Sequence, residues 1–121
     1  MQIQGIVIFA KDVARMSRFY GEVLGLPRIV ETETAGWVEF RAGGATLALH
    51  AIPQEIADTI HLTEPPEPRM DTPLKVIFRV SDVAAERDRL VEQGVSMLPM
   101  RPWDACDGLD PEGNVFQITR G

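Results

Sequence analysis

Short apolar segments, separated by turns rich in glycine and proline, run along most of the chain. The first, at 5–10, consists of β-branched, aromatic and small residues and is short enough for a strand. Asp12 follows it as a good N-cap residue, and apolar side chains then recur at helical spacing as far as Leu24. Gly25 suits the left-handed position after a helix. The pattern predicts a strand followed by a helix.

Three more strands are predicted in this part of the chain. Their spans are Arg28–Glu33, Gly36–Arg41 and Ala45–Ala51. Ala42-Gly43-Gly44 separates the last two and is typical of a hairpin turn.

The same order of elements returns about 70 positions later. The sequence Asp-Val-Ala at 12–14 recurs at 82–84, again after an apolar segment, Lys75–Val80, and before a helical stretch that ends at Gly94. Strands are then expected at Val95–Met100, Cys106–Leu109 and Asn114–Thr119, and a tight turn at Asp110–Gly113. We therefore predict an α+β fold, with two βαβββ modules in tandem forming curved mixed sheets around a concave pocket and the helices on the outer face.

The predicted domain covers 1–121, with module 1 at 1–52 and module 2 at 74–121. The segment 53–73 between them holds five of the nine prolines, which is typical of extended chain and excludes a central strand. We interpret it as a connector with a short helical turn near 54–60. A mobile lid over a pocket is the alternative.

Alternation along the strands divides their side chains between two faces. The apolar sets are expected to pack on the helices, and the other sets to line the concave side. The concave sets are Trp37, Glu39 and Arg41; Thr46, Ala48 and His50; Lys75, Ile77 and Arg79; and Val115, Gln117 and Thr119. A polar concave face suits a small ligand, although alternation alone does not distinguish it from a solvated face.

Composition narrows the classes of partner. The net charge of −6 argues against nucleic acid, and no apolar run is long enough to cross a bilayer or to resemble a signal peptide. The single cysteine, Cys106, is consistent with a reducing compartment and is interpreted as a small buried residue. These features predict a cytoplasmic protein without nucleic-acid or membrane partners.

Two segments carry a family resemblance. KDVARMSRFYGEVLGLP at 11–27 and GLDPEGNVFQI at 108–118 resemble signatures of the vicinal oxygen chelate superfamily of glyoxalases, bleomycin-resistance proteins, fosfomycin-resistance proteins and extradiol dioxygenases. The resemblance spans nearly the whole chain and implies the tandem-module fold.

The resemblance also implies four positions at which metal-using relatives place His or Glu ligands. In this sequence they map to Gly5, Ala48, Lys75 and Gln117. Leu74 is the alternative on the fifth strand. Two of these residues have no donor, one is a cation and one is a neutral amide, so we predict that the inherited metal site is missing and that no cofactor is used.

Other residues offer ligand chemistry, each with a plainer alternative. His50 and Glu39 are weak candidates for a general base or a relocated metal site, or else polar pocket wall. Lys75 and Arg79 can attract a carboxylate or phosphate, unless Glu39 or an interface carboxylate neutralises them. Trp37 and Trp103 can stack on a planar ligand or serve packing alone. We expect the ligand-binding set to comprise Trp37, Glu39, His50, Lys75, Arg79, Trp103 and Gln117.

The resulting prediction is a metal-independent binding protein of the bleomycin-resistance type. It would sequester a small, partly planar compound in a pocket at a homodimer interface, because unpaired sheet edges need covering. One alternative is a glyoxalase-like lyase or dioxygenase with a relocated or non-standard site. The other is an interaction module whose pocket is vestigial.

Overall fold

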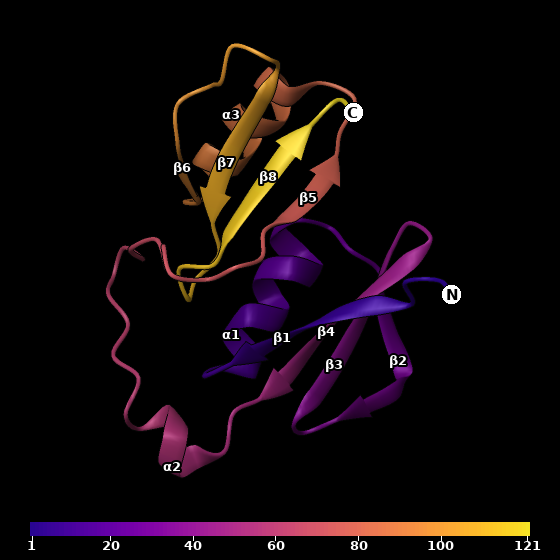
Figure 1. Ribbon diagram of the computed structural model, residues 1–121, viewed down its shortest axis with the longest axis vertical. Helices are drawn as coiled ribbons and strands as arrows, with labels where there is room; N and C mark the ends of the chain where they lie inside the picture. The colour runs from indigo at the N-terminus through magenta and orange to yellow at the C-terminus, as the bar shows by residue number, and fades with distance from the viewer. The chain divides into compact units, whose positions relative to one another are not determined.

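The computed structural model describes residues 1–121 and divides into two compact units, Met1–His61 and Leu62–Gly121 (Figure 1). Each unit is described by itself below. Each contains one four-stranded mixed sheet and repeats the order strand, helix, three strands. The α+β fold of two βαβββ modules predicted from the sequence is confirmed.

The first unit is built around the sheet β1-β4-β3-β2. Strand β1 runs parallel to β4, and the other neighbours are antiparallel. Its elements are β1 (Gly5–Ala10), α1 (Val13–Arg18), the π-helical turn η1 (Phe19–Val23), β2 (Arg28–Thr34), β3 (Trp37–Ala42), β4 (Ala45–Ala51) and α2 (Gln54–Ala57).

The first helix differs from the uniform helix expected up to Leu24. Asp12 caps it, because its Oδ1 accepts the N–H of Arg15 at 3.0 Å. The α-helical part ends at Arg18, and the chain continues as a π-helical turn in which Leu24 N–H donates to the carbonyl of Phe19 at 2.9 Å. The apolar residues as far as Leu24 follow the three- and four-residue spacing of an α-helix, so the sequence pattern gave no sign of this change.

The core of the first unit lies between its sheet and α1-η1. Buried side chains of β3 and β4, Val38, Phe40, Leu47 and Leu49, face the buried Met16, Phe19 and Tyr20 of the helical segment. Strand alternation therefore places residues 37, 39, 46, 48 and 50 on the opposite, helix-free face.

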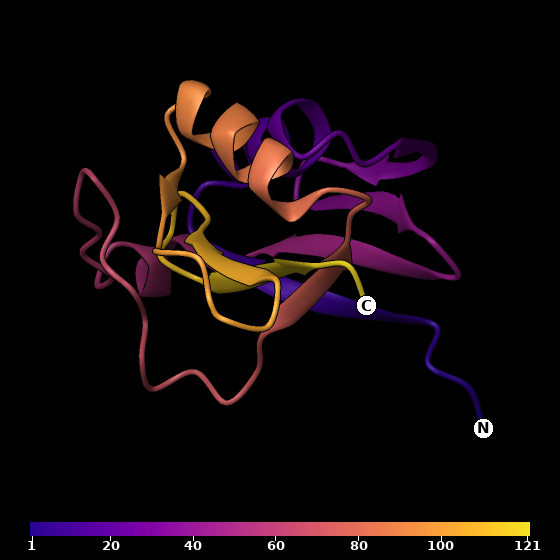
Figure 2. The same cartoon turned by 90° about the horizontal axis from the view of Figure 1, so that it is seen from above.

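The second unit has the sheet order β5-β8-β7-β6, with β5 parallel to β8. Its elements are β5 (Val76–Arg79), α3 (Val83–Glu92), β6 (Ser96–Met97), β7 (Ala105–Leu109) and β8 (Val115–Thr119). Figure 2 shows α3 on one side of this sheet. Asp82 caps α3 through the N–H of Ala85 at 3.0 Å, just as Asp12 caps α1.

Strand β6 is much shorter than the expected Val95–Met100. Pairing continues one residue past its end, where Leu98 N–H donates to the carbonyl of Asp107 at 2.8 Å. Pro99 then has no N–H to donate, and pairing resumes only as a single bridge between Arg101 and Ala105. Proline thus ends the regular edge strand.

The turn predicted at Asp110–Gly113 is present and is fixed by a buried carboxylate. Asp110 Oδ1 accepts the N–H groups of Glu112 and Asn114 at 2.9 and 3.0 Å, and Gly113 has φ 83°. This turn sets the register between β7 and β8, in which Leu109 lies opposite Val115 and Asp107 opposite Gln117. The conspicuous Asp-Pro-Glu-Gly-Asn sequence therefore has a structural role.

None of the helices is long and apolar enough to span a lipid bilayer. The segment 53–73 contains α2 and otherwise lacks regular helix or strand. That this segment is a linker separate from the two modules remains a prediction. Whether it is a plain connector or a lid over a pocket also remains a prediction.

Candidate ligand-binding faces

The helix-free face of the first unit presents a row of aromatic rings. In the pairing register His50 on β4 lies opposite Phe9 on β1 and opposite Trp37 on β3. The ring centroids are 5.7 Å apart for Phe9 and His50, and 5.6 Å apart for Trp37 and His50. Phe9 is 61% exposed, so a large part of this apolar surface is open to a ligand within its unit.

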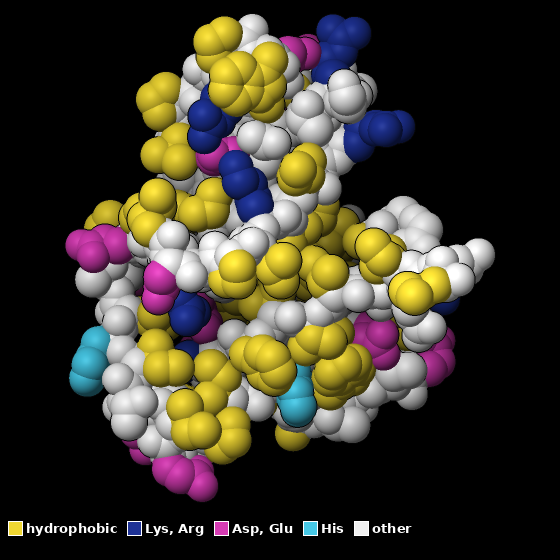
Figure 3. Space-filling model, in the orientation of Figure 1, with side chains coloured by type: hydrophobic (Ala, Val, Ile, Leu, Met, Phe, Trp, Pro, Cys, Tyr) yellow, Lys and Arg dark blue, Asp and Glu magenta, His cyan; other side chains and the backbone are white.

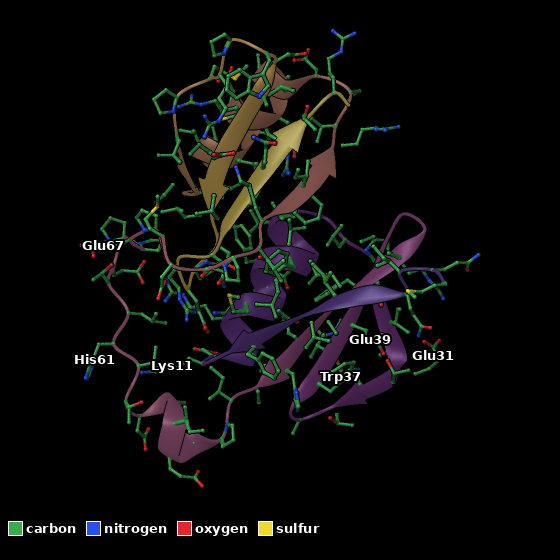
Figure 4. All side chains as sticks on the ribbon, viewed as in Figure 1. Lys11, Glu31, Trp37, Glu39, His61 and Glu67 are labelled. Atoms are coloured by element: carbon green, nitrogen blue, oxygen red, sulfur yellow. The ribbon has the colours of Figure 1, made fainter.

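Glu39 lies beside this row and is held by Trp37 (Figure 4). The indole Nε1 donates to Oε1 of Glu39 at 3.0 Å. This hydrogen bond, together with one from Thr32, lowers the pKa of Glu39 below its ordinary value, while slight desolvation opposes the shift. Because a lowered pKa makes a carboxylate a weaker base, the geometry gives Glu39 an orienting role rather than that of a general base.

His50 and Glu39 are not direct partners in the strand register, and their joint role as a base or a metal site remains a prediction. Glu39 is opposite Ala48 in the register, whereas His50 is opposite Trp37, and no hydrogen bond joins His50 to Glu39. Trp37 contacts both residues, by ring packing on one side and by its N–H on the other. The second histidine, His61, lies on the loop after α2, away from Trp37 and Glu39 (Figure 4).

The corresponding face of the second unit carries a polar cluster centred on Asp107. Lys75 Nζ lies 3.2 and 3.3 Å from the two carboxylate oxygens, Arg101 Nη2 donates to Oδ2 at 2.6 Å, and Gln117 Nε2 donates to Oδ1 at 2.9 Å. The Asp107 side chain is only 5% exposed, while those of Lys75 and Arg101 are 37% and 40% exposed. We call these four residues the Asp107 cluster.

The Asp107 carboxylate is stabilised in its charged form. Burial alone would raise its pKa, but hydrogen bonds from Arg101, Lys75 and Gln117 and the charge of Lys75 outweigh burial and hold the pKa below the ordinary value. Figure 3 shows basic side chains flanking a small acidic area over β7 and β8. Lys75 is thus paired with Asp107, a carboxylate of its own sheet. Pairing of Lys75 or Arg79 with Glu39, which lies in the other unit, or with an interface carboxylate remains a prediction.

Arg101 is positioned from a second direction by Trp103. Its guanidinium carbon lies 5.3 Å from the centre of the Trp103 ring, which is 63% exposed. Arg79 is exposed on the same face, opposite Thr119 in the register. Trp37 and Trp103 belong to different units, so joint stacking on one ligand remains a prediction.

The four positions that metal-using relatives would equip with ligands do not fit a metal ion here. Lys75 and Gln117 both direct nitrogen donors at Asp107, and Ala48 is a buried alanine. At Gly5 a Cβ would lie 2.6 Å from the backbone oxygen of Thr46, so the backbone leaves no room for a side chain. No group of three His, Cys, Asp or Glu side chains is arranged to hold a metal elsewhere.

Sequence reasoning missed three contributors to these faces: Phe9, Arg101 and Asp107. Phe9 alternates with the buried Ala10 and could have been found by extending the strand pattern to β1. The tight turn at Asp110–Gly113 could have placed Asp107 opposite Gln117. Arg101 lies in the irregular segment after Pro99, where no periodicity signals its position.

Cys106 is buried, in agreement with its interpretation from the sequence as a small buried residue. Its Sγ lies 3.0 Å from the carbonyl oxygen of Leu98. Burial raises the pKa of the thiol above its ordinary value, and the positive charge of Arg87 opposes the shift only in part. A protonated, inaccessible thiol is a poor nucleophile.

The chain belongs to the Glyoxalase/Bleomycin resistance protein/Dioxygenase superfamily, whose family model matches residues 2–118. The match covers both modules and both faces described above. No curated protein matches the chain.

Solved structures share the fold at low sequence identity. TnmS3, an antibiotic binding protein from Streptomyces sp. CB03234, is 22% identical with a TM-score of 0.68, over 98% of this chain and 94% of that one. Lactoylglutathione lyase from Agrobacterium tumefaciens is 22% identical with a TM-score of 0.70, over 97% and 91%. The fosfomycin resistance protein FosX from Mesorhizobium loti is 18% identical with a TM-score of 0.68, over 99% and 91%. Binding proteins and enzymes therefore share this architecture, so fold alone does not select the function.

Proposed function

We propose that this protein binds a small, partly planar compound, without a metal ion, and thereby sequesters it. The aromatic row of Phe9, His50 and Trp37 on the helix-free face of the first unit is the observation that carries the proposal. Flat rings gain dispersion and edge-to-face contacts on such a surface, and sequestration requires affinity alone.

Two further observations favour binding over catalysis. The positions equivalent to the family's metal ligands provide no set of oxygen, imidazole or thiolate donors, and Gly5 has no space for a side chain. Glu39, the carboxylate hydrogen-bonded to the aromatic row, has a lowered pKa and is held by Trp37. The likeness to an antibiotic binding protein is consistent with the proposal, although at 22% identity it demonstrates only the fold.

A titration with 2-naphthol, observed by two-dimensional NMR of the ¹⁵N-labelled protein, tests the proposal. The chain has two tryptophans, so Trp37→Phe and Trp103→Phe assign the two indole N–H signals without ambiguity. We expect saturable shifts of the Trp37 indole and weaker binding of decahydro-2-naphthol, the non-planar counterpart.

Variants locate the binding surface within this face. Phe9→Leu retains an apolar side chain but removes a ring, and we expect it to weaken 2-naphthol binding about five-fold, in line with the worth of aromatic contacts. Val91→Ala is the control, because it shortens an exposed apolar side chain on α3, and it should leave the affinity unchanged. Equal binding of the planar and non-planar compounds, or no saturable shift of the Trp37 indole, would refute the proposal.

We also propose that the protein is a homodimer with its binding pocket at the interface between chains. The sheets end in edge strands, β1 and β2 in one and β5 and β6 in the other, and β1 presents the exposed apolar side chains Val7 and Phe9. Such edges favour pairing with another strand. Sedimentation equilibrium should give twice the 13.4 kDa mass of the chain, and a monomer at working concentration would contradict the dimer.

A further inference from the structure

The Asp107 cluster carries more positive than negative charge. It contains two cations, Lys75 and Arg101, around the single carboxylate of Asp107, and Gln117 adds no charge. Its net charge near neutral pH is therefore about +1, on a protein whose total is −6. The surplus lies on the helix-free face of the second unit, where Arg79 adds another exposed cation.

Hydrogen-bond donors in the cluster remain unused after Asp107 is satisfied. Arg101 contacts the carboxylate through Nη2, and its Nε and Nη1 donate to no other protein group. Lys75 Nζ has three protons and makes only the two long contacts with Asp107. Both cationic side chains are more than one-third exposed, so these donors can reach a bound group.

The donors are also held in place before any ligand arrives. Arg101 is fixed by its 2.6 Å bond to a buried carboxylate and by the Trp103 ring 5.3 Å from its guanidinium carbon. Ordering a side chain in advance reduces the entropy lost on binding. The exposed Trp103 ring and Ile77, which is 58% exposed and lies opposite Gln117, supply apolar surface beside the cations.

From this arrangement we infer that the Asp107 cluster binds the oxyanion of an aromatic acid, with Lys75 and Arg101 contacting the anionic group and Trp103 contacting the ring. A guanidinium and an ammonium presented together match the paired oxygens of a carboxylate, phosphate or phosphonate. Asp107 acts as a positioning residue, because it orients both cations without contacting the anion.

The inference specifies a ligand class for the proposed binding function and rests on that function. Its readout nevertheless lies on a different unit from the aromatic row of Phe9, His50 and Trp37. If 2-naphthol does not shift the Trp37 indole signal, the proposal for the aromatic row fails. If benzoate does not shift the Trp103 indole signal, the inference for the Asp107 cluster fails, and the two results can be told apart.

Benzoate and benzamide form the decisive pair of probes, because they have the same shape and differ in charge. In the ¹⁵N-labelled protein we expect benzoate to shift the Trp103 indole and the Gln117 side-chain amide in a saturable way. Benzamide should bind at least ten-fold more weakly. Inorganic phosphate should shift the Gln117 amide with little change at Trp103, because it has the anion without the ring.

Two variants test the roles of the cations, and a third controls for total charge. Arg101→Gln and Lys75→Gln should each weaken benzoate binding at least ten-fold, whereas Arg89→Gln removes the same charge from α3 and should have no effect. Using both cluster variants keeps the test valid if one of them folds poorly. Equal affinity for benzamide, no saturable benzoate shift, or full binding by folded Arg101→Gln and Lys75→Gln proteins would overturn the inference.

Discussion

Gln117 Nε2 donates a 2.9 Å hydrogen bond to Oδ1 of Asp107, its direct partner across the β7-β8 pair. The sequence resemblance maps Gln117 to a position at which a metal ligand is expected in metal-using relatives, and here its amide donates to a buried carboxylate. The same carboxylate also contacts Lys75, which the resemblance maps to another of those positions. In the second unit, both mapped positions therefore belong to a network of hydrogen bonds and charges centred on Asp107.

Asp107→Asn should destabilise the protein. The substitution removes the negative charge that balances two cations, and it replaces one acceptor oxygen of a buried group with an amide. Breaking a fully buried ion pair costs about 3–5 kcal/mol, and the partial exposure of Lys75 and Arg101 reduces the expected cost to about 1–3 kcal/mol. Urea unfolding followed by circular dichroism measures this difference in the free energy of unfolding.

Asp104→Asn is a matched control for that measurement. Asp104 lies 3.8 Å from Arg120, and both side chains are largely exposed, at 49% and 69%. Exposed pairs contribute little, so a change within about 0.5 kcal/mol is expected. If the two variants lost the same amount of stability, the burial of Asp107 would have no energetic consequence.

The pH dependence of stability should carry the signature of Asp107. Its pKa in the folded protein lies below the ordinary value, so folding favours the ionised form. This contribution is complete above the unfolded pKa, about 4, and is lost as the pH falls through the lower folded pKa. We expect the free energy of unfolding of the wild type to fall more than that of Asp107→Asn between about pH 5 and about pH 2, a range that spans the ordinary pKa of an aspartate. Parallel urea-derived stability curves for the two proteins would contradict this expectation.

The fold was predictable because its signals are local and occur twice. Asp12 and Asp82 each follow an apolar strand, and each caps the helix after it. The turn at Asp110 combines a carboxylate acceptor, a proline and a glycine in the order that the geometry needs. The π-helical turn leaves no sign in the apolar pattern, and the early end of β6 follows from Pro99, which has no N–H to donate.

The candidate site was less predictable because it depends on which side chains meet. Trp37, Glu39, Lys75 and Gln117 were placed on the correct faces by alternation alone. Their partners were not, since the pairing of Lys75 with Asp107 depends on strand order within the second sheet. Arg101 reaches Asp107 from a segment without regular structure, so sequence periodicity could not place it.

Gly5→Ala should be costly although alanine is a small residue. The added Cβ would lie 2.6 Å from the backbone oxygen of Thr46, on the strand that pairs with β1, and the backbone cannot move without disturbing that pairing. Overpacking of this kind costs about 1–3 kcal/mol. Gly44→Ala is the control, because its Cβ would meet no heavy atom within 4 Å. Thermal and urea unfolding of both variants would show whether position 5 excludes side chains, including those that could bind a metal.

Trp37→Phe should raise the pKa of Glu39. The indole N–H is the principal cause of the lowered pKa, and phenylalanine retains the ring packing against His50 but has no donor. The hydrogen bond from Thr32 remains, so the pKa should move toward its ordinary value without fully reaching it. An NMR titration of the ¹³C-labelled carboxyl group measures the change. Trp103→Phe, a substitution of the same kind in the other unit, should leave the Glu39 titration unaltered. If the pKa of Glu39 were the same in Trp37→Phe as in the wild type, the indole would not orient this carboxylate in solution. The aromatic row would then have no carboxylate fixed beside it.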